Sequence, residues 1–210
     1  MTHSSVAAYS FIGSGRPLGP GDLIWLAALG SATRSASSAE SVCHCIETVA
    51  AGLWSPSPQL VCDCLDEMAR ARHLRFFRNG RQDLFAVTPQ GRGILSLMLG
   101  QPMERPSTTL GQVALRLKLA FLDLASPDDR TLHLTDMIAA HEAELASRPT
   151  ACGACHAPGC FGRMWSEHHT DTLRREINLL RKMINPTPHD SLETGEGCSI
   201  GGLRLNCISN

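Results

Sequence analysis

The chain has 210 residues, of which 43% are apolar and 5% aromatic, and its formal charge at pH 7 is −1. This length allows one domain of ordinary size plus a smaller helical unit, and the charge excludes a globally basic nucleic-acid coat while leaving a local basic site open. The longest apolar run, Leu23 to Leu29, is too short to cross a membrane, and no basic stretch precedes it as in a signal peptide. We therefore expect a cytoplasmic protein without membrane contact.

The chain begins with residues 1–20, which are rich in Ser, Gly and Pro and are predicted to form a flexible arm. Asp22 is expected to cap a first helix over Leu23–Leu29, which is apolar on almost every side and therefore buried. The small residues at positions 30–38 predict a turn.

Two further helices are predicted to form a helix-turn-helix pair. Ser37-x-x-Glu40 is a capping box that indicates the start of the second helix. Ser57 is a favoured N-cap and Pro58 a favoured first helical residue, and apolar residues follow at spacings of three and four. The third helix is expected to end near Ala71.

A hairpin follows directly. Leu74, Phe76 and Phe77 suit a strand, Asn79-Gly80 is a strong two-residue turn signal, and residues 84–87 suit a returning strand. Five arginines and no acid lie between positions 70 and 81, the densest positive run in the chain. Helix, strand, turn and strand together predict a winged helix-turn-helix domain over residues 21–100.

Residues 108–185 are predicted to form a helical dimerisation and sensing module, because amphipathic helices with few neighbours need a second copy to cover them. Its helices are expected over Leu110–Leu124, over residues 126–147 and over Trp165–Asn185, ahead of a flexible tail at 186–210. The residues expected at the dimer contact are Leu117, Phe121, Leu173, Ile177, Leu180 and Ile184. The fold class is thus mostly α with a small β wing, a winged helix-turn-helix plus a C-terminal helical dimerisation module.

This pattern resembles the PadR family of bacterial transcriptional regulators over about residues 21–185. The likeness is carried by Trp54-Ser55-Pro56-Ser57-Pro58, by Arg78-Asn79-Gly80-Arg81 and by Phe85-x-Val87-Thr88-Pro89-Gln90-Gly91-Arg92. It implies an N-terminal winged helix and C-terminal helices that dimerise. Residues 151–162 have no counterpart in the family pattern.

The resemblance implies a double-stranded DNA operator as partner. Short polar side chains near the start of a recognition helix can reach base edges, and arginines on a wing mainly position the protein. Ser57 could instead serve only as a helix cap, and Asp63 only as a solvated carboxylate. The expected DNA-contacting residues are Ser57, Gln59, Asp63, Arg75, Arg78, Asn79 and Arg81.

The most distinctive local motif lies in residues 148–163, where Cys152-x2-Cys155 is followed by Cys160. Three thiols on one short loop bent by Gly and Pro suit zinc or an iron–sulfur cluster. A thiol switch without metal and an inert connecting loop are the alternatives. The candidate fourth ligands are His156, His168, His169, Cys198 and Cys207.

The sequence thus predicts a dimeric DNA-binding transcriptional regulator, a repressor, whose Cys-rich loop senses redox state or a bound metal or cluster. The alternative is a protein-interaction adaptor built on a winged helix that does not bind DNA. We expect no enzyme activity, because the sequence contains no Gly-rich phosphate loop, nucleophile elbow or paired carboxylates.

Overall fold

The computed structural model describes residues 15–103, 105–147 and 159–185. Within these ranges no helix is long and apolar enough to cross a membrane. Cys152, Cys155 and His156 lie outside the described residues, as do the tail and most of the predicted arm. The described elements are α1 (Pro20–Arg34), α2 (Ala39–Ala50), α3 (Pro58–Arg70), β1 (Leu74–Asn79), β2 (Gln82–Val87), α4 (Pro89–Leu99), α5 (Thr109–Phe121), the 3-10 helix η1 (Leu122–Leu124), α6 (Pro127–Ser147) and α7 (Cys160–Ile184).

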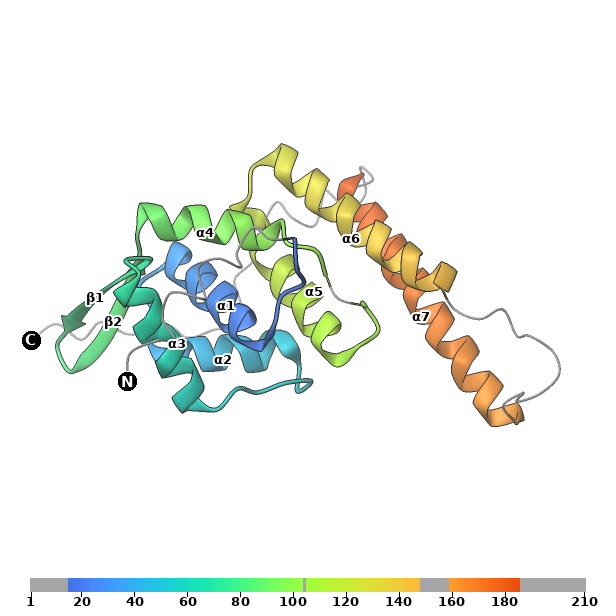
Figure 1. Ribbon diagram of the computed structural model, residues 1–210, viewed down its shortest axis with the longest axis horizontal. Helices are drawn as coiled ribbons and strands as arrows, with labels where there is room; N and C mark the ends of the chain where they lie inside the picture. The colour runs from blue at the N-terminus through green and yellow to red at the C-terminus, as the bar shows by residue number, and fades with distance from the viewer. Residues whose placement is uncertain (1–14, 104, 148–158, 186–210) are drawn as a thin grey trace, which may run out of the picture.

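These elements form two parts (Figure 1). Helices α1 to α5 and the β1–β2 hairpin make a compact winged helix-turn-helix domain, from which α6 and α7 project as an antiparallel pair. The described residues are therefore mostly helical with one small two-stranded sheet, which confirms the predicted mostly α fold with a small β wing.

Helix α1 lies at the centre of the compact part and contacts α2, α3, α4 and α5. Its residues 23–29 are all buried, which confirms that a helix apolar on almost every side is a core helix. The predicted turn at 30–38 was partly wrong, since α1 continues through Gly30 to Arg34. Gly30 fits there because Phe121 of α5 lies directly against it.

Two predicted helix starts are wrong, the first by three residues and the second by one. Helix α1 begins at Pro20 with Gly19 as N-cap, and Asp22 is its third residue, whose Oδ2 accepts a hydrogen bond from Gly19 N at 2.8 Å. In α2 the cap is Ser38, whose Oγ accepts from Ser41 N. Ser37 instead exchanges backbone hydrogen bonds with Phe85, so it is held by the sheet and is not available to cap the helix.

The hairpin is shifted by one residue from its predicted turn. Asn79 pairs with Gln82, which leaves Gly80 and Arg81 as the two loop residues. Gly80 has a φ of 61°, and a positive φ at the first loop position is where a two-residue hairpin favours glycine. The bridge to Ser37 joins the hairpin to the α1–α2 connection.

Five of the six predicted dimer residues are buried within the single chain, and the sixth, Ile184, is half-buried. Leu117 and Phe121 belong to the core of the compact part, and Leu173, Ile177 and Leu180 are buried between α7 and its neighbours. Every residue from 160 to 168 is exposed, and Figure 1 shows these first turns of α7 projecting past the end of α6. The most exposed apolar side chains of this stretch are Phe161, Met164 and Trp165, which are 82%, 61% and 67% exposed.

Candidate nucleic-acid interface

Helix α3 presents one polar face to solvent. Ser57 Oγ accepts a hydrogen bond from Leu60 N at 3.3 Å and Pro58 is the first helical residue, which confirms the predicted cap. Four apolar side chains face the core, namely Val61, Cys64, Leu65 and Met68, whereas Leu60 is 40% exposed. The opposite face is free to meet a partner.

The exposed face of α3 is acidic. Gln59 Nε2 donates to Asp63 Oδ1 at 2.8 Å, one helical turn away, so the two predicted contact residues hold each other. Asp66 is also exposed. A carboxylate in the major groove can accept a hydrogen bond from cytosine N4, whereas beside the backbone it repels phosphate. This face therefore suits base edges better than phosphates.

The wing supplies the positive charge next to α3. Arg78 Nε donates to Asp83 Oδ1 at 2.9 Å across the hairpin, and the guanidinium holds the pKa of the Asp83 carboxyl below its usual value. Arg75 and Arg81 are exposed, and neither side chain has a hydrogen bond or ion pair within the described residues. Two of the three wing arginines are thus free to contact an anion.

All seven residues predicted to contact DNA are exposed in the structure. They lie on α3 and on the hairpin beside it (Figure 1). The pairing of Arg78 with Asp83 was missed, because a turn at Asn79-Gly80 places other residues opposite each other. Once the turn is at Gly80-Arg81, the register puts Asp83 directly across from Arg78.

Of the predicted metal ligands, the structure describes Cys160, His168 and His169, all on α7. Cys160 and His168 are exposed, but they lie eight positions apart on the helix, a rise of about 12 Å, which is too far for one tetrahedral ion, and His169 lies one position further from Cys160. The His168 ring packs against Trp165 at a centroid distance of 5.5 Å. In the described ranges no three His, Cys, Asp or Glu side chains are grouped closely enough to hold a metal.

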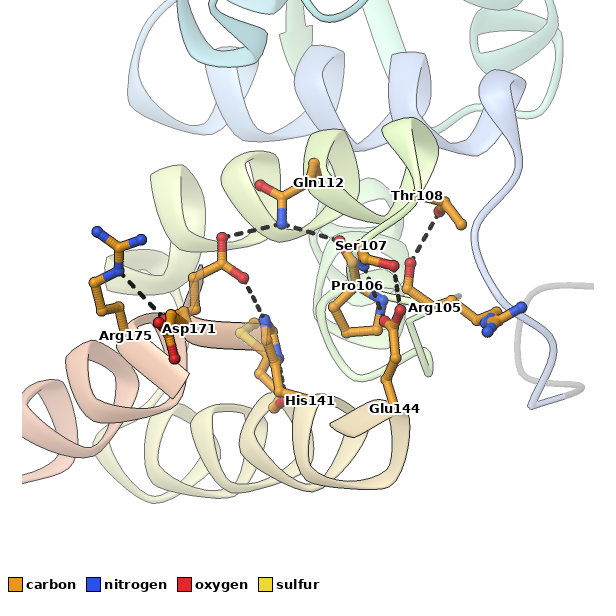
Figure 2. A network of polar contacts seen from close by, with 11 residues as sticks. Arg105, Pro106, Ser107, Thr108, Gln112, His141, Glu144, Asp171 and Arg175 are labelled. Carbon is orange, nitrogen blue, oxygen red and sulfur yellow. Dashed lines mark hydrogen bonds and ion pairs between the residues drawn. The ribbon is translucent and has the colours of Figure 1, made fainter. Parts of the chain in front are cut away.

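Polar contacts join the start of α5 to the projecting pair (Figure 2). Ser107 donates from both its backbone N and its Oγ to the Glu144 carboxylate of α6. Gln112 Nε2 donates to Pro106 O at 2.9 Å and to Glu176 Oε1 of α7 at 3.1 Å. The other oxygen of Glu176 lies 3.3 Å from Nε2 of His141, a fully buried side chain. Movement of α7 relative to α6 would disturb this network.

The folded chain is a winged helix-turn-helix protein with two projecting helices. No family model matches its sequence, and no curated protein matches it.

Among solved structures the chain is similar to PadR of Bacillus subtilis. The complex with operator DNA is 15% identical, with 76% of this chain and 97% of that chain covered at a TM-score of 0.35. The complex with p-coumaric acid is 17% identical, with 80% and 96% covered at a TM-score of 0.36. A third PadR structure is 17% identical, with 80% and 97% covered at a TM-score of 0.36.

Proposed function

We propose that this chain is a DNA-binding transcriptional regulator, a repressor, that places α3 in the major groove and the β1–β2 hairpin beside the phosphate backbone. The observation that carries the proposal is an exposed polar helix face next to a wing whose Arg75 and Arg81 form no ion pair with any residue in the described ranges. Two such units in a dimer would read two half-sites.

The proposal predicts different effects for two neighbouring arginines of the wing. Arg81→Ala should weaken binding about equally for all DNA sequences and lower the slope of log K against log salt by about 0.9, because one phosphate contact is lost. Arg78→Ala should have the smaller effect, since Asp83 already neutralises Arg78. Mobility shifts over a salt series, on genomic fragments first selected by the wild-type protein, measure both.

Arg175→Ala serves as the control, because Arg175 is exposed on α7, away from the wing. Wild-type affinity of Arg81→Ala at every salt concentration would overturn the assignment of the wing.

A protein-interaction adaptor is the second candidate, and the acidic face of α3 favours it. Asp63 and Asp66 are exposed there beside Leu60, which is 40% exposed, a composition that suits a protein surface as well as a groove. If the protein retains no fragment from a genomic DNA library, the adaptor is the better description.

We further propose that the Cys-rich loop is the sensing element, through zinc or an iron–sulfur cluster held by Cys152, Cys155 and Cys160. The separation of Cys160 from His168 favours a fourth ligand away from the body of α7, namely His156, Cys198 or Cys207. An iron–sulfur cluster can change its oxidation state and so report a redox signal, whereas structural zinc cannot. Cys160 is the first residue of α7, so a change in its bonding acts on the helix that carries Glu176 and the contact to α5.

Metal content and a visible spectrum of protein purified without oxygen test this proposal. Stoichiometric iron with charge-transfer absorption in the wild type, lost in Cys155→Ser, is expected for a cluster, and zinc lost in the same variant indicates a structural site. A wild type that contains neither metal would leave the thiol switch and the inert loop, with the DNA assignment unaffected.

A further inference from the structure

Helices α2 and α3 each carry two cysteines in the order Cys-x-Cys, and all four are free thiols. Cys64 is buried in the core of the compact part, and Cys43 and Cys45 are half-buried against the same core. Cys62 is exposed on α3. None of the four serves the proposed contact with DNA, so their chemistry is open.

Cys43 and Cys62 hold equivalent places on the two helices. Each directly follows a valine that is 0% exposed, Val42 on α2 and Val61 on α3. Successive residues lie about 100° apart around an α-helix, so each cysteine lies at the rim of the face that its helix buries. Helices α2 and α3 pack against each other and lie side by side in Figure 1. The two thiols therefore border the same helix-helix contact.

The side of α2 that carries Cys43 faces the connection to α3. Glu47 lies one turn further along that side, and its Oε1 accepts a hydrogen bond from Ser55 Oγ at 3.0 Å, two residues before the cap of α3. Burial raises the pKa of the Cys43 thiol, and so do the neighbouring Glu47 carboxylate and the Cys62 thiol. One thiol acts electrostatically on another only when the two are neighbours, which agrees with their place at one contact.

The two thiols differ in access, and this sets the order in which they react. The thiolate is the nucleophile in thiol chemistry, and an exposed thiol meets a reagent from solvent first. Cys62 is exposed, whereas Cys43 is half-buried and protonated at pH 7 because its pKa is raised. An oxidant therefore attacks at Cys62, and Cys43 is placed to react with the product.

We propose that Cys43 and Cys62 are a redox-active pair that forms a disulfide between α2 and α3 on reaction with a hydroperoxide. The Cys62 thiolate attacks the terminal oxygen of the hydroperoxide, the O–O bond breaks, and the alkoxide leaves and takes up a proton. This gives the sulfenic acid of Cys62 and an alcohol. The Cys43 sulfur then attacks the Cys62 sulfur, and the hydroxyl group leaves with the Cys43 thiol proton as water. Two thiols are thus oxidised to one disulfide while the hydroperoxide is reduced to alcohol and water.

This pair is separate from the Cys-rich loop that precedes α7. A bond between α2 and α3 would fix the position of α3 on the compact part, and α3 is the helix whose polar face is exposed. It would therefore act on any partner of that face, whether DNA or protein. The inference does not rest on DNA binding, and its test needs no DNA.

The test is peptide mapping of the full chain after exposure to cumene hydroperoxide and alkylation of the remaining free thiols. Cleavage after Glu47 and before Asp63 places Cys43 and Cys62 on separate peptides. We expect mass spectrometry to find these two peptides joined, and fragmentation to place the bond at Cys43 and Cys62. Reduction with dithiothreitol should separate them, and protein kept reduced should yield both peptides alkylated.

Two variants and a matched control make the result specific. Cys62→Ser should lose the joined peptides, and its Cys43 should be alkylated. Cys43→Ser should stop at the sulfenic acid of Cys62, which dimedone traps, so this variant should gain a dimedone adduct that the wild type does not accumulate. Cys45→Ala is the control, because Cys45 is also half-buried on α2 and should leave the joined peptides at the wild-type yield.

Several results would overturn the proposal. These are complete alkylation of both cysteines in the oxidised wild type, a bond from Cys62 to Cys45 or to a cysteine of the loop, or a loss of the joined peptides in Cys45→Ala equal to that in Cys43→Ser. Each of these results leaves the proposed DNA-binding function standing, since none of the measurements involves DNA.

Discussion

At the scale of single residues, Lys118 makes the stability of the fold depend on pH. Burial lowers the pKa of its amine from 10.5 to about 8, so in the unfolded chain the amine binds its proton more tightly. Between about pH 8 and 10.5 the unfolded state therefore carries the extra proton, and the free energy of unfolding must rise with pH. The two pKa values correspond to a total rise on the order of 3 kcal/mol.

This prediction is measured as a difference between two proteins. Burial raises the pKa of the Cys64 thiol to about 11, so that thiol lowers stability over part of the same pH range and would mask Lys118 in the wild type alone. Urea unfolding of the wild type and of Lys118→Met should be compared across this pH range. The contribution of Cys64 is the same in both proteins and cancels in the difference. The difference should grow in favour of the wild type as pH rises, and a difference that stays constant would show that the amine is not desolvated.

At the scale of elements, α1 and α5 meet at a glycine. A Cβ built on Gly30 would lie 2.5 Å from ring atoms of Phe121, whereas carbon atoms normally approach to about 3.5–4.0 Å. Alanine favours a helix over glycine by about 0.5–1 kcal/mol, but overpacking a core costs about 1–3 kcal/mol. The cost of overpacking should exceed the gain in helix propensity, so Gly30→Ala should destabilise the fold.

Gly21→Ala is the control for this substitution in the same helix. No atom lies within 4 Å of a Cβ at Gly21, so this change should be neutral or stabilising. Denaturant unfolding of both variants, and of Gly30→Ala with Phe121→Leu, measures the effect. The double variant should recover part of the loss, and equal stability of Gly30→Ala and Gly21→Ala would contradict the close packing.

The elements that sequence predicts well are those whose signals are local. Ser57-Pro58 defines the start of α3 because an N-cap and a favoured first residue act within one turn. Ser37 and Ser38 are equally good caps by themselves, and the choice was made by a distant residue, Phe85, which pairs with Ser37. Residues that are close in space but far apart in sequence therefore decide between helix starts that local signals favour equally.

The same reason explains why the sequence did not indicate that Lys118 and His133 are both buried. A lysine in an amphipathic helix such as α5 is expected at the surface, and nothing in its surroundings in sequence indicates that carbonyls of Leu99 and Gln101 lie beside it. His133 could have been placed on the buried side of α6, since it lies four residues before Met137 and eight before His141. That His133 lines a cavity with Lys118 and the end of α4 follows only from the position of α4 in the fold.

At the scale of the whole molecule, the projecting pair has an apolar surface that the described part of the chain does not cover. Five of the six predicted dimer residues are buried within the chain and Ile184 is half-buried, so a second copy would mostly contact other side chains. The first turns of α7 offer Phe161, Met164 and Trp165, all exposed beyond the end of α6. A protein in water rarely leaves such side chains together on a projecting helix without a partner.

We expect Phe161→Ser with Trp165→Ser to shift the protein from dimer to monomer in sedimentation equilibrium, because large aromatic side chains dominate the energy of small interfaces. Leu132→Ser is the control, since Leu132 is 57% exposed but lies near the start of α6, away from this stretch. The α6–α7 core should remain folded in both, because its buried residues are unchanged. A double variant that dimerises like the wild type would place the contact elsewhere, and a wild type that is monomeric at all concentrations would exclude the dimer.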